Sequence, residues 1–128
     1  MLAVERVDFV GVPVTDRERA VRFYGETLGL KQNPLSKPEW PEFETGNLTL
    51  NITVPAALGR EFRPSPAAIA LRVPDVAEGR RMLEEAGVEF RGETVDTGVC
   101  HMAFFSDPDG NALMLHHRYA PYADGTAL

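Results

Sequence analysis

The sequence contains two copies of one pattern, and this internal repeat limits the possible folds more than any other feature. In each copy an alternating apolar stretch, typical of a strand, precedes a helix that starts near an acidic residue and ends at glycine. Asp16 and Asp75 lie 59 positions apart, and Gly29 and Gly87 lie 58 apart. A copy of this size buries too little of its own sheet, so we expect the two copies to form one domain, residues 1–128.

The first copy, about residues 5–54, predicts a strand, a helix and three further strands. Its helix is expected to begin at Thr15, which is spaced from Glu18 as in a capping box, and to reach about Thr27. The expected strands cover residues 9–14, 30–35, 43–44 and 48–54.

The second copy, about residues 67–118, follows a linker of about residues 55–66 that contains three prolines. Its helix is expected to begin at Asp75, with Glu78 completing the capping box. The tail, residues 119–128, is expected to be extended, either crossing to a dimer partner or merely mobile. The expected strands cover residues 69–73, 88–95, 99–105 and 111–118.

The last two strands enclose Asp107-Pro108-Asp109-Gly110, a combination typical of the turn in a β-hairpin. All three histidines, His101, His116 and His117, lie in this hairpin. Side chains two positions apart share a face of a strand, so Met114 and His116 are expected to face the same way. Counting back across the turn pairs His116 with His101, which predicts two histidines side by side.

Composition and charge exclude several classes of partner. The net charge is -6, without a basic run, so nucleic acid and anionic membranes are not expected to bind. The single cysteine, Cys100, excludes an intramolecular disulfide. Glu5, Arg6 and Asp8 interrupt any signal-peptide core, and no apolar run reaches membrane-spanning length. We therefore expect a cytoplasmic protein.

Two segments, VGVPVTDRERAVRFYGETLGL and FFSDPDGNALMLHH, resemble the vicinal oxygen chelate superfamily, and the resemblance extends from about Val7 to His117. This superfamily includes glyoxalase I, methylmalonyl-CoA epimerase, extradiol dioxygenases, and fosfomycin- and bleomycin-resistance proteins. The resemblance implies an α+β fold in which two βαβββ modules form a curled mixed sheet around a cup, with the helices on the outer face. It also implies a homodimer.

The resemblance further implies where a divalent metal would bind, because the ligands of family enzymes point into the cup. Those positions fall on Phe9, Leu50, Ala68 and Met114. None of these side chains suits a hard divalent cation, since the thioether of methionine is a soft ligand. We therefore expect the usual metal site to be absent and no cofactor to be needed.

Four interpretations of the predicted His101–His116 pair remain open. The pair forms a displaced metal site, since imidazole binds several transition metals. Alternatively it forms an acid–base pair, or it hydrogen-bonds a ligand. The fourth interpretation is an exposed strand end without a chemical role.

Other side chains are candidates for contact with a ligand. Arg72 is either a clamp for a carboxylate or phosphate, or a surface residue whose stem covers the sheet. Trp40 either stacks on a planar ligand or packs locally. An apolar floor is expected from Phe9, Phe43, Phe105 and Met114. The candidate ligand-binding residues are Phe9, Trp40, Leu50, Ala68, Arg72, His101, Met114 and His116.

Two functions are consistent with these residues. The first, which we prefer, is a metal-free protein that binds a small organic molecule in an apolar cup, as bleomycin-resistance proteins do. The alternative is a lyase, isomerase or dioxygenase-type enzyme whose metal or acid–base pair has moved to His101 and His116.

Overall fold

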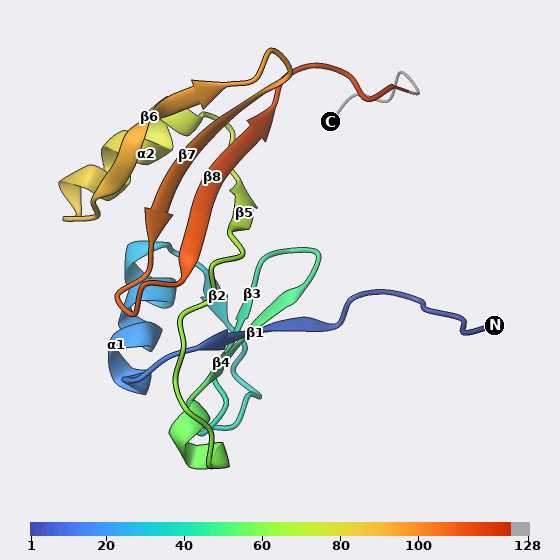
Figure 1. Cartoon of the computed structure of the whole chain (residues 1–128), viewed down its shortest axis with the longest axis vertical. Helices are drawn as coiled ribbons and strands as arrows, with labels where there is room; N and C mark the ends of the chain where they lie inside the picture. The colour runs from blue at the N-terminus through green and yellow to red at the C-terminus, as the bar shows by residue number, and fades with distance from the viewer. Residues whose placement is uncertain (124–128) are drawn as a thin grey trace. The chain divides into compact units, whose positions relative to one another are not determined.

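The computed structural model describes residues 1–123, and the chain forms two compact units, Met1–Pro64 (unit 1) and the part from Ser65 onward (unit 2) (Figure 1). Each unit contains one four-stranded mixed sheet, with strand order β1-β4-β3-β2 in unit 1 and β5-β8-β7-β6 in unit 2. In both units the first strand runs parallel to the last, and the other pairs are antiparallel. The predicted duplication of a βαβββ unit and the α+β class are therefore confirmed.

The helix of unit 1 begins one residue later than the capping box predicted. Asp16 is the N-cap, and its carboxylate accepts a hydrogen bond from the backbone N–H of Arg19 at 3.0 Å. Thr15 instead accepts a bond from the Arg19 side chain at 3.3 Å. The elements of unit 1 are β1 (Phe9–Pro13), α1 (Arg17–Arg22), a π-helical turn (Phe23–Thr27), β2 (Lys31–Gln32), β3 (Glu42–Glu44), β4 (Thr49–Thr53) and a 3-10 helix (Pro55–Leu58).

Strand β2 is shorter than the six residues expected from the sequence. The backbone N–H of Asn33 still donates to the carbonyl of Glu42 at 2.8 Å, but the Asn33 side chain then accepts from the N–H of Leu35 at 3.0 Å. This Asx-type turn, which contains Pro34 between its two bonded residues, ends the strand.

The core of unit 1 lies on the side of its sheet that faces α1. Alternation along β4 buries Leu50 and Ile52 and leaves Thr49, Asn51 and Thr53 on the opposite face. Each parallel partner on β1 follows the same rule, since Val10 pairs with Leu50 and Val12 with Ile52. The buried side chains of unit 1 are Val12, Val14, Ala20, Phe23, Tyr24, Pro41, Phe43, Leu50 and Ile52.

Unit 2 repeats this arrangement, with α2 along one face of the sheet (Figure 1). Asp75 caps α2 as predicted and accepts from the N–H of Glu78 at 3.1 Å. The helix packs so closely that a Cβ added at Gly79 would lie 3.0 Å from the Cδ1 atom of Leu115. Its elements are β5 (Ile69–Arg72), α2 (Val76–Glu85), β6 (Phe90–Asp96), β7 (Cys100–Ser106) and β8 (Ala112–Arg118).

The turn between β7 and β8 is held by two buried polar side chains. One oxygen of Asp107 accepts from the backbone N–H groups of Asp109 and Asn111, each at 2.9 Å. The other accepts from the side-chain amide of Asn111 at 2.8 Å. The Asn111 amide oxygen accepts from the N–H of Ser65, also at 2.8 Å, and so ties the start of unit 2 to the turn. Within residues 1–123 no helix is long and apolar enough to cross a membrane.

Candidate functional site

The observed register of β7 and β8 differs by one residue from the predicted one. Met102 lies opposite His116, and His101 lies opposite His117. The prediction placed one more residue in the loop, whereas the N–H of Asp107 donates to the carbonyl of Asn111 and the ladder continues to the pair Ser106–Ala112. His101 and His116 therefore face opposite sides of the sheet, and the expected histidine pair is wrong.

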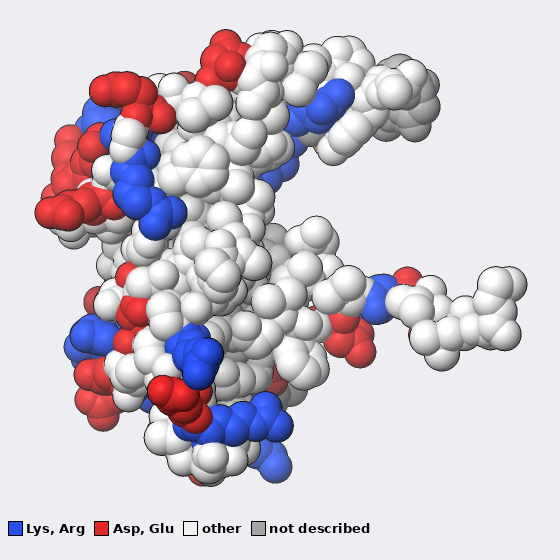
Figure 2. Space-filling model, in the orientation of Figure 1, with Lys and Arg blue, Asp and Glu red and all other residues white. Residues whose placement is uncertain are grey.

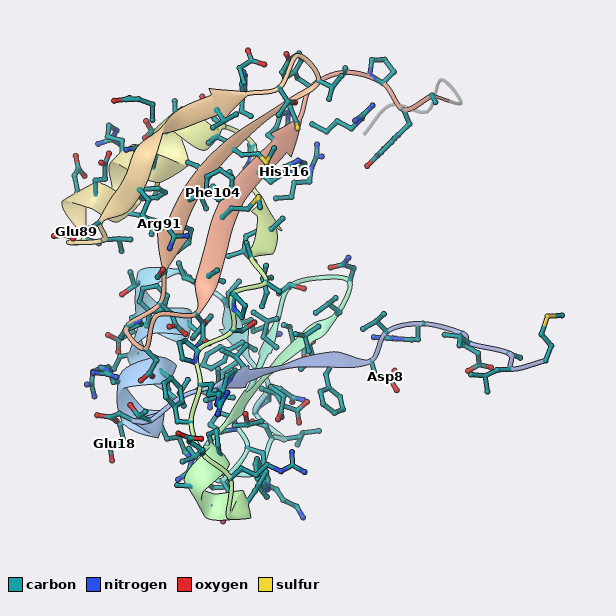
Figure 3. All side chains as sticks on the ribbon, in the orientation of Figure 1. Asp8, Glu18, Glu89, Arg91, Phe104 and His116 are labelled. Carbon is teal, nitrogen blue, oxygen red and sulfur yellow. The ribbon has the colours of Figure 1, made fainter. Side chains whose placement is uncertain are left out.

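One face of the unit 2 sheet, which we call the open face, points away from α2. Ladder partners lie side by side on the same face, so two rows of its residues run across all four strands, and the β7–β8 pairs Ser106–Ala112 and Cys100–Arg118 lie beyond these rows on the same face. One row is Arg72, His116, Met102 and Val95, and the other is Ala70, Met114, Phe104 and Arg91 (three of them are labelled in Figure 3). The predicted shared face of Met114 and His116 is confirmed, and Arg72 lies on the same face as the ladder partner of His116.

The opposite face of this sheet is core. Phe105, expected on the ligand floor beside Met114, is fully buried, and its ring centroid lies 5.1 Å from that of Phe90. The guanidinium of Arg80 on α2 lies over the Phe90 ring at 4.9 Å, which places this pair beneath the helix. The expectation for Phe105 was wrong because of the register, and the residue that takes its place on the open face is Phe104.

The open face combines apolar and cationic side chains. Met102, Phe104 and Met114 are partly exposed, and neither ladder row contains a carboxylate. Arg72 forms no ion pair with any residue that the structure describes. Figure 2 shows acidic and basic side chains crowded over α2 and β6, whereas the surface over β7 and β8 is mainly uncharged.

The four positions implied for a metal can now be placed in each unit. Phe9 lies on β1 and is 60% exposed, while Ala68 immediately precedes β5. Met114 is on the open face, as expected. Leu50, however, pairs with Val10 in the fully buried core of unit 1, so it cannot contact a ligand on the face that carries Phe9.

Comparison of the two ladders identifies the residue that sequence matching missed. Val10 pairs with Leu50 as Ile69 pairs with Leu113, so Asn51, one residue further, is the counterpart of Met114. The four positions thus carry a phenyl ring, a methyl group, an amide and a thioether. This donor set does not fit a hard divalent cation. Over residues 1–123, no three His, Cys, Asp or Glu side chains are grouped to hold a metal ion.

The remaining candidates occupy separate places. Trp40 is half-buried in the turn after β2, where its backbone N–H donates to the carbonyl of Lys37 at 2.9 Å. Phe43 is fully buried against Tyr24 and does not form part of an exposed floor.

His117 makes a 2.9 Å hydrogen bond between its Nδ1 atom and the carbonyl of Val73. His116 is thus the histidine that the ladder places on the open face.

His101 belongs to a polar cluster with Asp96 and Tyr119 at the end of the β6–β7 hairpin. Its Nε2 atom lies 3.4 Å from Asp96, and its ring lies 4.8 Å from that of Tyr119. The Tyr119 hydroxyl donates to Asp96 at 2.7 Å, as does the backbone N–H of Gly98 at 2.8 Å. The Gly98 bond, then the Tyr119 bond, lower the pKa of Asp96, and the same carboxylate raises the pKa of Tyr119.

Sequence reasoning missed Asp96 and Tyr119. The Asp96-Thr97-Gly98 turn was a usable signal, because it places Asp96 opposite His101. Nothing local signalled Tyr119, which lies 23 positions from Asp96.

This cluster predicts a pH dependence. We expect Tyr119 to titrate above the ordinary tyrosine pKa of about 10 and Asp96→Asn to bring it back toward that value, because an amide carries no negative charge. The stabilisation from Tyr119 is present below pH about 10 and is lost as the pH rises through its raised pKa. The stabilisation from Asp96 is present above pH about 4 and is lost as the pH falls through its lowered pKa.

NMR titration of labelled tyrosine rings measures the pKa of Tyr119 directly, with Tyr119→Phe identifying its signal. The matched control is Asp109→Asn, which makes the same change at another turn of unit 2. A Tyr119 pKa that is the same with and without the Asp96 carboxylate would contradict the interaction.

Comparison with known proteins agrees with this fold. The sequence profile of the Glyoxalase/Bleomycin resistance protein/Dioxygenase superfamily matches residues 6–115. No match is found among curated proteins.

Several solved structures are similar over nearly the whole chain. An antibiotic binding protein from a Streptomyces species is 28% identical, with 92% of this chain and 99% of that chain covered and a TM-score of 0.76. A superfamily member from Sphaerobacter thermophilus is 26% identical, with 90% and 98% covered and a TM-score of 0.75. A glyoxalase family protein from Bacillus anthracis is 25% identical, with 92% and 98% covered and a TM-score of 0.77. The chain therefore belongs to the glyoxalase/bleomycin resistance protein/dioxygenase superfamily, the vicinal oxygen chelate proteins of the resemblance.

Proposed function

We propose that this protein binds a small organic molecule on the open face of unit 2 and does so without a metal ion. The observation that carries the proposal is the adjacent placement of Met102, Phe104 and Met114, which are partly exposed on a sheet face that no helix covers in the described part of unit 2, residues 65–123. Thioether and phenyl groups provide adaptable apolar contact area, as small-molecule sites require. The antibiotic-binding relative supports a binding function in this fold.

Binding is favoured over catalysis by the chemistry of the face. The enzyme hypothesis required His101 and His116 to act together, and the ladder separates them. The metal positions of the family carry side chains without the anionic oxygens or imidazoles that a catalytic divalent ion needs. What remains is a surface suited to contact and orientation of a ligand.

A neutral fluorescent probe, N-phenylnaphthylamine, tests the proposal. We expect saturable binding with one site per chain, and we expect Met114→Ala to raise the dissociation constant by about fivefold, since part of a methionine side chain no longer contacts the probe. The matched control is Met82→Ala, because Met82 is exposed on α2.

If the Met114→Ala and Met82→Ala proteins bind N-phenylnaphthylamine with equal affinity, the proposed site is wrong. The thermal unfolding of each variant is recorded first, so that a loss of binding is not confused with a loss of folded protein.

The expectations for assembly and surroundings remain part of this proposal. We expect a homodimer in a cytoplasmic setting, with Ala68, which immediately precedes β5 of unit 2, as an additional ligand contact. Light scattering of the purified protein gives the molar mass, and a mass of one chain would contradict the dimer.

A further inference from the structure

We infer that the ligand of the open face carries one anionic group, a carboxylate, sulfonate or phosphate, which binds between Arg72 and His116, and a flat apolar body. This inference rests on the proposed binding function and adds the chemical class of the ligand. It follows from the positions of the Arg72 guanidinium and the His116 imidazole relative to the apolar side chains of the open face.

Arg72 and His116 are direct ladder partners on neighbouring strands. Their backbones lie about 4.8 Å apart, and both side chains leave the same face of the sheet. A guanidinium offers two parallel N–H donors, and an imidazole offers one more from either ring nitrogen. One planar or tetrahedral anion can therefore accept hydrogen bonds from both residues at once.

The charges around this pair favour an anion from outside over an internal partner. Within residues 1–123, neither Arg72 nor His116 forms an ion pair or a hydrogen bond through its side chain. The carboxylate of Asp96 lies on the other face, where Tyr119 and Gly98 bind it. Glu93 lies in the irregular stretch between Arg91 and Val95 and has no ladder partner on the open face.

The apolar side chains next to the pair set the shape of the rest of the ligand. Met102 continues the row of Arg72 and His116, and Met114 lies one row away, about 7 Å along the strand. Phe104 lies beside Met114 and offers a ring for stacking. Arg91, three strands from Arg72, is about 15 Å away and cannot share the same small anion. The anionic end is thus fixed at the β5–β8 side, and the body lies over β8 and β7.

Two probes that differ by one sulfonate separate this inference from the proposed function. Anilinonaphthalene sulfonate has the ring system of N-phenylnaphthylamine plus a single negative group. We expect the sulfonate probe to bind about tenfold or more tightly than the neutral probe, as a charge-assisted hydrogen bond provides. In Arg72→Ala and in His116→Ala the ratio of the two affinities should fall toward one.

The control is Arg81→Ala, which removes the same charge from α2, where Arg81 pairs with Glu78 and Glu85. It should keep the wild-type ratio, because the lost charge is remote from the open face. A ratio that is equally high in wild type and Arg72→Ala overturns the anion site, while saturable, Met114-dependent binding of the neutral probe still supports the proposed function. If neither probe saturates, the proposed function itself fails.

Discussion

Replacing Phe105 with alanine is expected to lower the free energy of unfolding by about 3–5 kcal/mol, the range for removing a fully buried phenylalanine. Phe105 has no exposed surface, and it packs against Phe90 on the α2 side of the sheet. The change would remove this aromatic contact and leave a cavity beneath the helix. Chemical denaturation monitored by circular dichroism measures the effect.

The adjacent residue supplies a matched control. Phe104→Ala deletes the same atoms from the open face, where the side chain is partly exposed, so we expect a loss of only about 1 kcal/mol together with weaker probe binding. Equal destabilisation by the two substitutions would contradict the register on which the open face is defined.

Replacing Asp107 with alanine should cost about 2–4 kcal/mol, because the donors that its carboxylate satisfies would remain buried without an acceptor. These donors are the backbone N–H groups of Asp109 and Asn111 and the side-chain amide of Asn111. Asp107 and Asn111 are only 5% and 3% exposed, so water cannot readily replace the lost bonds. Urea denaturation at neutral pH gives the change in unfolding free energy.

An exchange of the two side chains tests the network more sharply than deletion. Asp107→Asn alone brings two amide groups together as opposing donors, and Asn111→Asp alone brings two carboxylates together. The double variant Asp107→Asn/Asn111→Asp restores one donor and one acceptor with unchanged net charge, and a carboxylate oxygen at 111 can still accept from Ser65. We expect it to be more stable than either single variant. A double variant as unstable as the sum of the two would show that this pairing does not hold the turn.

The fold could be predicted because the signals that determine it are local and occur twice. The alternation of Val10, Val12 and Val14, the helix cap at Asp75 and the glycine that ends each helix all depend on neighbours within a few positions. The repeat spacing then placed both copies in one architecture. The errors were equally local: Asp16 replaced Thr15 as the cap, and the Asn33 turn shortened β2.

The site could be predicted only in part, because it depends on register. The two-residue period of a strand alone placed Met114 and His116 on one face, and the ladder confirms this placement. Which residues lie opposite β8 depends on the closure of the turn, and there Asn111 is bound to Ser65, 46 positions away. No spacing rule along the hairpin reveals that bond. An error of one residue in the register of β7 and β8 placed Phe105 instead of Phe104 on the open face. The same error paired His101 with His116, which the structure does not do.

The division of each strand between a core face and an open face has a consequence for how such a protein can change. Selection for folding acts on Leu113, Leu115 and their counterparts in unit 1, while the positions between them can vary at little cost to the folded state. The two copies already differ in this way, since Glu42 lies opposite Asn51 on strand β3 of one copy, and Phe104 lies opposite Met114 on the matching strand β7 of the other. A new specificity therefore needs substitutions at alternate positions of a few strands. A combinatorial library of substitutions confined to the open face would vary the ligand specificity while the buried core of the fold stays unchanged.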